Sequence, residues 1–343
     1  MKLEDIKLLI NSEKYEFLHT NPHLGNKIVF LTLGGSYAYG TNVDTSDIDI
    51  RGCALNSRSD ILGLSNFEQV VNTQTDTTIY SFNKLINLLL NCNPNTIELL
   101  GCRLEQYFVI TDIGKEMLDN RKMFLSQRVV KSFGGYATAQ LRRLENAIAR
   151  DAMSQSRKEE HIRNSMESSL QQFKDRYEDF NEGSIKLYTG KSKRDDMDTE
   201  ILVDVNLHGF PARQFNCVMN DMTGVIGTYE NLTQRNKKKD AAHLNKHAMH
   251  LIRLYLMCLD ILEKEEINTY RENERDFLLS IRNGAFQNND GTYKKEFFDI
   301  VSEYEKRMEY AKKNTSLPTH PNMKIIEDFV ISVNRRAIDE SLQ

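Results

Sequence analysis

The fold is decided by residues 28–52, which read IVFLTLGGSYAYGTNVDTSDIDIRG. The first six residues are apolar or β-branched and end at two glycines, a pattern that predicts a buried strand. Residues 45–52 alternate polar and apolar side chains, which predicts a second strand. Because side chains two apart on a strand share a face, we expect Asp47 and Asp49 to point together, with Arg51 on the same side.

Two carboxylates on one face of a strand make a candidate metal site. They repel each other unless a cation lies between them. Mg²⁺ is the usual cation in such a place, since it binds one or two carboxylates together with phosphate oxygens and water. We therefore expect Asp47 and Asp49 to bind Mg²⁺, as two ions, with Mn²⁺ as the alternative metal.

A glycine turn separates the two predicted strands. Gly34 and Gly35 let the backbone bend tightly and approach a ligand closely. If Ser36 opens a helix, its hydroxyl and the first N–H groups suit a phosphate. A phosphate-binding turn beside paired carboxylates is typical of two-metal phosphoryl or nucleotidyl transfer, in which ions about 3.5–4 Å apart bind the attacking and leaving oxygens.

Two-metal sites of this kind normally have a third carboxylate that activates the attacking hydroxyl. Asp76 is the best candidate, because it lies on the next predicted strand, at residues 70–80. An antiparallel pairing of that strand would place Asp76 opposite Asp49. Glu68 is the alternative third carboxylate.

These motifs together resemble the DNA polymerase beta nucleotidyltransferase superfamily, whose signature is Gly-Ser followed by Asp-x-Asp. The fuller string at residues 35–41 and 46–52 looks like one branch of it, the predicted nucleotidyltransferases associated with RNA repair. Three later segments also look like that branch: residues 93–100, 246–254 and 270–275. The resemblance spans roughly residues 28–285.

The resemblance implies a mixed sheet with flanking helices and Mg²⁺-dependent transfer of a nucleoside monophosphate from a nucleoside triphosphate. It also implies roles for individual residues. Ser36 would hold the triphosphate, Asp47 and Asp49 would bind both metals, and Asp76 would match the third acid. The donor base and the acceptor do not follow from the resemblance.

A basic stripe is expected on a helix at about residues 239–263. Lys246, His250 and Arg253 are spaced four and three residues apart, so they share one side of that helix. The stripe either forms a wall of the site that faces triphosphate or an RNA backbone, or is a charged face exposed to water. The expected nucleotide-binding residues are Gly34, Gly35, Ser36, Arg51, Lys246, His250 and Arg253.

The chain changes character near residue 115, where short apolar runs with turn signals give way to helical periodicity. We therefore expect an α+β fold with two domains. Residues 1–115 would form a small mixed β-sheet nucleotidyltransferase domain with flanking helices, and residues 116–343 a larger, mostly helical domain. Residues 181–200 are polar and rich in turn formers, and are expected to form a mobile loop.

Composition excludes several classes of protein. Of 343 residues, 40% are hydrophobic and 27% charged, which is typical of a globular chain rather than a disordered one. The net charge of −4 excludes a bulk polycation, so nucleic acid would be bound by local basic patches. No segment approaches the roughly 18 apolar residues of a membrane-spanning helix. Five scattered cysteines without a CxxC pair fit reduced thiols, and we expect a cytoplasmic protein.

Three functions remain open at this point. The first is a metal-dependent nucleotidyltransferase with a macromolecular acceptor, for which an RNA with a tRNA-like end is the first choice and ATP one candidate donor. The second is nucleotidylation of a protein side chain, of the AMP-transferring type. The third is a non-catalytic module that binds a nucleotide or RNA. The sequence does not indicate the oligomeric state.

Overall fold

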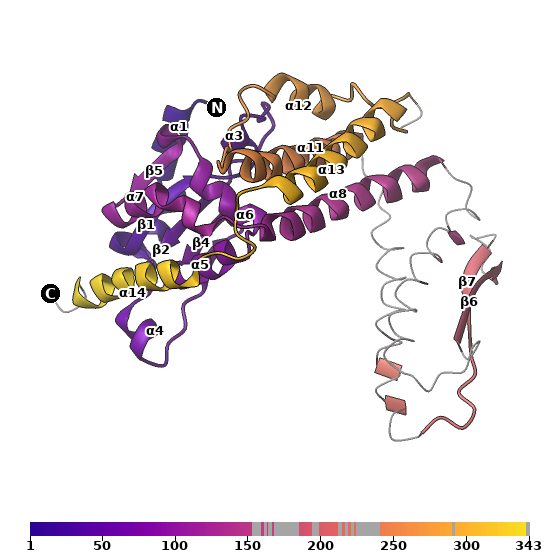
Figure 1. Ribbon diagram of the computed structural model, residues 1–343, viewed down its shortest axis with the longest axis horizontal. Coiled ribbons are helices and arrows are strands. Elements are labelled where there is room, and N and C mark those ends of the chain that lie inside the picture. Colours follow the sequence, from indigo (N-terminus) through magenta and orange to yellow (C-terminus); the bar gives the residue numbers. More distant parts are fainter. Residues whose placement is uncertain are drawn as a thin grey trace. The chain divides into compact units, whose positions relative to one another are not determined.

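The computed structural model describes residues 1–152, 159–160, 163, 167, 185–193, 199–211, 215–216, 219–220, 223, 241–289 and 292–340 (Figure 1). The chain divides into two compact units. Unit 1 comprises Met1–Leu141, Lys246–Phe286 and Lys295–Gln343, and unit 2 comprises Arg142–Asn245 and Gln287–Lys294. Residues on both sides of position 115 therefore contribute to unit 1.

Unit 1 contains a five-stranded mixed sheet with the strand order β3-β4-β2-β1-β5. Strand β1 pairs antiparallel with β2 and β5, β3 pairs antiparallel with β4, and β2 and β4 are parallel. The bounds are β1 Ile28–Leu33, β2 Ile50–Ala54, β3 Gln69–Asn72, β4 Thr77–Ser81 and β5 Tyr107–Ile110. This sheet and the helices around it confirm the predicted α+β class.

Helices and 3₁₀ turns make up most of the rest. The helices are α1 Leu3–Ile10, α2 Phe17–Thr20, α3 Gly35–Tyr39, α4 Arg58–Leu62, α5 Phe82–Leu90, α6 Pro94–Ile97, α7 Asp112–Asp119, α8 Arg128–Ala152, α11 Ala241–Lys264, α12 Arg275–Arg282, α13 Lys295–Asn314 and α14 Met323–Glu340. The 3₁₀ turns are η1 Glu13–Tyr15, η2 Gly25–Lys27, η3 Glu98–Gly101, η4 Leu104–Gln106 and η5 Arg121–Phe124. The expected mostly helical character of the C-terminal region is confirmed.

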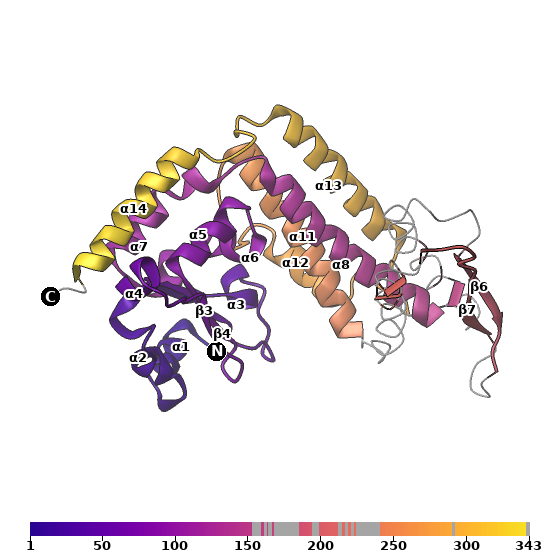
Figure 2. The same cartoon turned by 90° about the horizontal axis from the view of Figure 1, so that it is seen from below.

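Both faces of the sheet are covered. On one side, Ile6 of α1 and Leu18 of α2 belong to the same buried cluster as Leu31 and Leu33 of β1. Figure 2 shows α5 and α14 on the opposite side. Phe82 of α5 and a phenylalanine of α14, Phe329, pack with their ring centroids 6.0 Å apart. Strand β1 is buried along its whole length, as its apolar sequence predicts.

Helix α11 is the central helix of the remaining part of unit 1. Almost every side chain from Ala248 to Leu262 is buried, so it is a core helix rather than a surface one. Hydrogen bonds join it to α8 and to α13. His247 Nδ1 lies 2.8 Å from Gln140 Oε1 of α8, and the Tyr255 hydroxyl donates to Glu305 of α13 over 2.9 Å.

Unit 2 contains a two-stranded antiparallel sheet, β6 Ile185–Lys191 and β7 Thr199–Val205. Within the segment predicted to be a mobile loop, residues 185–191 and 199–200 thus lie in strands. Residues 181–184 and 194–198 lie outside the described part of the chain. Among the helices that the structure describes, none has the length and apolar character needed to cross a bilayer.

Two strand boundaries differ from the prediction. The strand expected at 45–52 begins at Ile50, so Asp47 and Asp49 lie in the segment that leads into β2. The strand expected at 70–80 is a hairpin of β3 and β4. The polar run between Asn72 and Thr77 forms its turn, and Asp76 there has a φ of 44°, in the left-handed region.

Candidate active site

The glycine turn lies directly against Asp49. Gly34 N–H donates to the Asp49 carbonyl over 2.8 Å, which extends the β1–β2 pairing by one step. Gly35 has a φ of 56°, a conformation that favours glycine. A Cβ atom at Gly35 would overlap the Asp49 carboxylate, and one at Gly34 would lie 2.8 Å from Cγ of Arg51. Gly35 is therefore needed for the carboxylate to approach the turn, and Gly34 for the Arg51 side chain to pack against it.

Asp76 lies beside Asp49. Strand β2 pairs with β4 in parallel, with Ile50 opposite Thr77, and Asp49 and Asp76 directly precede these two residues. Ile50 N–H donates to the Asp76 carbonyl over 3.2 Å. The predicted antiparallel pairing is wrong, because the antiparallel partner of β4 is β3. The two acids still meet, since each stands at the start of one of two parallel strands.

Arg51 links the two carboxylates. Its Nη2 lies 3.1 Å from Asp49 Oδ1 and 3.0 Å from Asp76 Oδ1. Its Nη1 donates to the carbonyl of Ile50 over 2.9 Å and also to the carbonyl of Asp76. The guanidinium thus supplies positive charge to the pair of acids, which would otherwise repel each other.

The two carboxylates have opposite pKa shifts. Burial and a hydrogen bond with Asp76 raise the pKa of Asp49 to about 7, against the opposing charge of Arg51. Burial acts in the same upward direction on Asp76, but the hydrogen bond with Asp49 and the charge of Arg51 lower the pKa of Asp76 overall. Two adjacent carboxylates that share a proton in this way titrate as a pair.

Asp47 and Glu68 are placed differently from Asp76. The Asp47 side chain is exposed, and among the described residues it has no hydrogen-bond or ion-pair partner. Glu68 pairs with Lys84 at 2.5 Å and lies at the other end of the β3–β4 hairpin, where its carbonyl accepts the Ser81 N–H. The structure therefore brings Asp76 rather than Glu68 to Asp49.

A divalent cation needs several oxygen ligands close together. Across the described residues, no three His, Cys, Asp or Glu side chains group as a metal site. Asp49 and Asp76 nevertheless provide adjacent carboxylate oxygens, and burial, the largest cause of the raised pKa of Asp49, disfavours an unpaired negative charge there. These oxygen ligands fit Mg²⁺ or Mn²⁺.

Ser36 leaves its hydroxyl available. The residue is half-buried in α3, and its carbonyl accepts the Thr41 N–H over 2.9 Å. Within the described part of the chain, the Ser36 hydroxyl has no hydrogen-bond partner. A half-buried hydroxyl that directly follows Gly35, the glycine that contacts Asp49, is a ready donor to a ligand oxygen.

The expected basic stripe of α11 divides into two environments. Lys246 is exposed. Its positive charge opposes the rise in the pKa of Asp49 and adds to the lowering of the pKa of Asp76, so it lies near the carboxylate pair. His250 packs edge-to-face on Tyr39, with centroids 6.3 Å apart. Burial, helped by the positive charges of Arg253 and other basic neighbours, lowers the pKa of His250 well below its ordinary value.

Arg253 is only 5% exposed. Its Nη1 lies 3.1 Å from Glu98 Oε2, and its guanidinium stacks 3.7 Å from the centroid of the Tyr39 ring. The Tyr39 hydroxyl donates to the Glu98 carboxylate at 2.9 Å. Arg253 thus holds the last residue of α3, while Lys246 at the open end of the stripe lies near the acids.

A comparison with protein families agrees with this geometry. Residues 9–179 match the model of a family described as the RNA repair pathway DNA polymerase beta family, RlaP. Over that segment, the chain is similar to this family. The match confirms the predicted DNA polymerase beta-like branch tied to RNA repair. No curated protein and no solved structure gave a match.

The RlaP segment contains the glycine turn, Asp47, Asp49 and Asp76. Lys246, at the edge of the site, lies beyond the matched residues. Helix α11 therefore adds a basic side chain, from a part of the chain outside the match, to the acids of the RlaP segment.

Sequence reasoning missed Glu98 as part of this region. Glu98 is 5% exposed and follows the buried α6, and no local periodicity marks it as the partner of a residue more than 150 positions away. The only signal was a carboxylate inside the otherwise apolar run IELL, residues 97–100. Such a residue is rarely buried without a partner, so it invites a search for one.

Proposed function

We propose that this chain is a metal-dependent nucleotidyltransferase that transfers a nucleoside monophosphate from a nucleoside triphosphate to a macromolecular acceptor. The observation that carries the proposal is the adjacency of Asp49 and Asp76 against the glycine turn that leads into Ser36. Carboxylates suit divalent cations and the turn suits phosphate, and nucleotidyl transfer needs both at one place. The RlaP match supports the same class of reaction.

Asp49 and Asp76 are the residues that would hold the cation, together with Asp47, two residues before Asp49. Their carboxylate oxygens are the ligand type that Mg²⁺ and Mn²⁺ prefer. When bound, the metal would supply neutralisation of charge at the phosphate oxygens. Arg51 balances the same carboxylates from the protein side.

The phosphate side of the site is formed by Ser36 and Lys246. The Ser36 hydroxyl, which has no partner among the described residues, donates to a phosphate oxygen. Lys246 contributes a positive charge close to both acids. Gly35 lets the Asp49 carboxylate, and the cation that it would hold, lie against the turn that leads into Ser36.

The reaction forms one bond and breaks another at the α-phosphorus. The acceptor hydroxyl oxygen bonds to phosphorus while the bond to pyrophosphate breaks, with the two oxygens in line. We assign the hydroxyl proton to Asp76, the acid that directly precedes β4 beside Asp49. Positioning and electrostatic stabilisation supply most of the rate in this chemistry.

RNA is the acceptor that we propose first, because the family description refers to an RNA repair pathway. An RNA 3′ end with a tRNA-like form offers the hydroxyl that the reaction needs. Protein nucleotidylation is the alternative, since a serine, threonine or tyrosine hydroxyl meets the same requirement.

The test incubates the purified full chain with Mg²⁺ and each α-labelled nucleoside triphosphate, in the presence of total RNA or of a protein lysate. Label in RNA supports the first acceptor, and label in protein supports the alternative. Omitting the metal, or adding a chelator, should abolish transfer. Binding of a triphosphate without transfer to any acceptor would contradict the proposal and indicate a non-catalytic module.

The matched variants are Asp49→Asn and Asp44→Asn. Asp49→Asn should lower transfer by more than about 100-fold, since it removes one carboxylate from the metal site. Asp44 is exposed on the same loop and has no side-chain hydrogen bond or ion pair with the described residues, so Asp44→Asn should transfer normally. Equal transfer by both variants would show that the site is elsewhere.

A further inference from the structure

Two arginines of α12 contact the loop that joins α3 to Asp47. Arg275 Nε donates to the Gly40 carbonyl over 2.7 Å. Arg282 Nη1 donates to the Thr41 carbonyl over 2.7 Å, and its Nη2 lies 3.4 Å from Ser46 Oγ. These contacts reach the loop from residues more than 230 positions away in the sequence.

The loop itself is compact and depends on Ser46. Ser46 Oγ accepts the Val43 N–H over 2.9 Å, and Ser46 N–H donates to the Val43 carbonyl over 2.9 Å. Arg282 therefore contacts the residue that closes the loop on itself. Asp47 follows directly, so the position of Ser46 determines where the segment leading to Asp49 begins.

The side-chain hydrogen bonds of Arg282 go to this loop. Among the described residues it has no carboxylate partner, and its two hydrogen bonds go to Thr41 and Ser46. An exposed arginine ordinarily keeps its charge in water or pairs with an acid. A half-buried guanidinium whose hydrogen bonds end on a single loop instead fixes the conformation of that loop.

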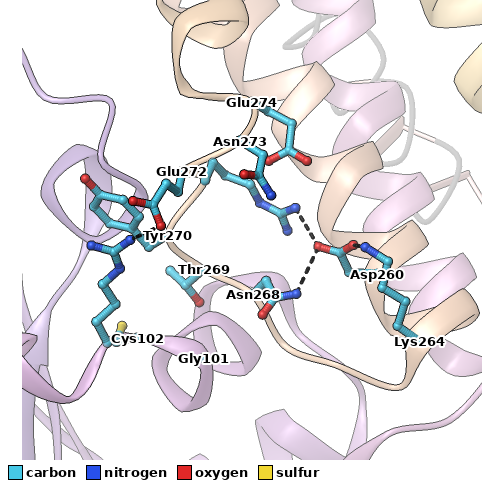
Figure 3. A pocket seen from close by; sticks show the side chains of 12 residues that line it. Gly101, Cys102, Asp260, Lys264, Asn268, Thr269, Tyr270, Glu272, Asn273 and Glu274 are labelled. Carbon is cyan, nitrogen blue, oxygen red and sulfur yellow. Dashed lines mark hydrogen bonds and ion pairs between the residues drawn. The ribbon is translucent and has the colours of Figure 1, made fainter.

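The segment that carries α12 is anchored at its beginning. Arg271 is 2% exposed, its N–H donates to the Tyr39 carbonyl over 3.0 Å, and its Nη1 lies 2.6 Å from Asp260 Oδ2 of α11. Figure 3 shows Asp260 in a pocket of about 310 Å³, where it also pairs with Lys264.

Tyr270 completes the anchor. Arg103 stacks 3.6 Å from the centroid of the Tyr270 ring and pairs with Glu272 at 2.7 Å. A Cβ at Gly40 would lie 2.6 Å from the same ring, so Tyr270 packs directly on the start of the loop. The lining of this pocket carries three basic and three acidic side chains, most of them paired with one another, which suits an anchor rather than a charged ligand.

We propose that Arg282, supported by Arg275, is a positioning residue of the active site. It holds the loop of residues 40–46 so that the Ser36 turn and the acids Asp47 and Asp49 keep a fixed separation. This inference rests on the proposed function. It adds a requirement: the acids of the matched segment are held in place by a helix from outside it.

Loss of the contacts between Arg282 and the loop should lower kcat more than it weakens binding of the nucleoside triphosphate. Arg282 is not one of the residues proposed to bind the triphosphate. Its loss should therefore change the KM for the nucleoside triphosphate by less than about threefold. The reacting groups would lose their alignment, and a misplacement of about 1 Å lowers kcat by up to about 100-fold.

The experiment compares the full chain with Arg282→Met, Arg282→Lys and Arg307→Met. Hydrogen exchange of a peptide covering residues 36–50, the melting temperature, and kcat and KM for transfer are measured on each protein. Arg282→Met should raise exchange in this peptide and lower kcat by about 10- to 100-fold. Arg282→Lys should recover part of the loss, because an ammonium group still donates to the Thr41 carbonyl.

Arg307→Met is the matched control. Arg307 lies on α13 and pairs with Glu263, so its loss should leave exchange at residues 36–50 and kcat unchanged. If Arg282→Met does not fold, Ser46→Ala removes one end of the same contact and should give a smaller effect in the same direction.

Two results would overturn the proposal that Arg282 holds the loop of residues 40–46. One is wild-type exchange in residues 36–50 for Arg282→Met. The other is a lower melting temperature with unchanged kcat per folded molecule, which would indicate a purely structural arginine. If the wild-type chain transfers no label at all, the proposed function fails, whereas the exchange measurement still decides whether Arg282 holds the loop.

Discussion

Asp49 lies beside Asp76 because each residue directly precedes one of two parallel strands, β2 and β4. Arg51 spans the pair, with Nη2 at 3.1 Å from one carboxylate and 3.0 Å from the other. The acids come from separate segments, so their proximity depends on the register of Ile50 with Thr77 rather than on a local motif.

The identity of the third carboxylate can be tested directly. Asp76→Asn should lower transfer by more than about 100-fold, because it removes the carboxylate that lies beside Asp49. Glu68→Gln should keep wild-type activity, since Glu68 pairs with Lys84 at the far end of the hairpin. Steady-state transfer by both variants is the measurement. A reversed order of the two effects would assign the role to Glu68.

Gly35→Ala should destabilise the fold. The new Cβ would overlap the Asp49 carboxylate, and the alanine would have to adopt a φ of 56°. We expect the free energy of unfolding in urea to fall by about 1–3 kcal/mol. Gly135→Ala is the control, because a Cβ at Gly135 in α8 meets nothing within 4 Å. It should raise stability by up to about 1 kcal/mol through helix propensity.

The buried pair of Glu98 and Arg253 predicts a large effect of removing one partner. Glu98→Ala leaves the Arg253 guanidinium uncompensated in the core and should lower the free energy of unfolding by about 3–5 kcal/mol. Glu272→Ala breaks the exposed pair with Arg103 and should cost at most about 1 kcal/mol. Chemical denaturation of both variants gives the comparison, and similar small losses would show that the buried pair contributes little.

Stability should fall in acid partly because of His250. Burial lowers its pKa in the folded state, so below a pH of about 6.5 the unfolded chain binds a proton that the folded chain does not. The free energy of unfolding therefore rises with pH across this range. The raised pKa of Asp49 acts in the opposite direction, so the prediction concerns the difference between variants.

His250→Gln should flatten the dependence of stability on pH between about 5 and 6.5, relative to the wild-type chain. Denaturant unfolding at several pH values in that range measures the slope. His320→Gln is the matched control, because His320 is exposed, and it should keep the wild-type slope. An unchanged slope in His250→Gln would mean that the imidazole takes up its proton over the same pH range in the folded and the unfolded chain.

Local sequence signals predicted a large part of the site. The apolar run before Gly34 predicted the buried strand β1, and the two glycines predicted a tight turn, in which Gly35 has a φ of 56° that favours glycine. The Asp-x-Asp pattern pointed to the acids, and the family match confirmed the branch that these motifs resemble. These features depend on residues close together in the chain, where side-chain periodicity and backbone sterics can be predicted from the sequence.

Packing decided what the sequence left open. The parallel pairing of β2 with β4, the burial of Arg253 against Glu98, and the contact of Arg282 with the loop at Thr41 all join segments far apart in the chain. An arginine in a helical stripe has the same sequence spacing whether it faces water, a phosphate or a buried acid. Only the packing of α11 and α12 selects among these partners, because that packing determines which charges lose water and must be paired.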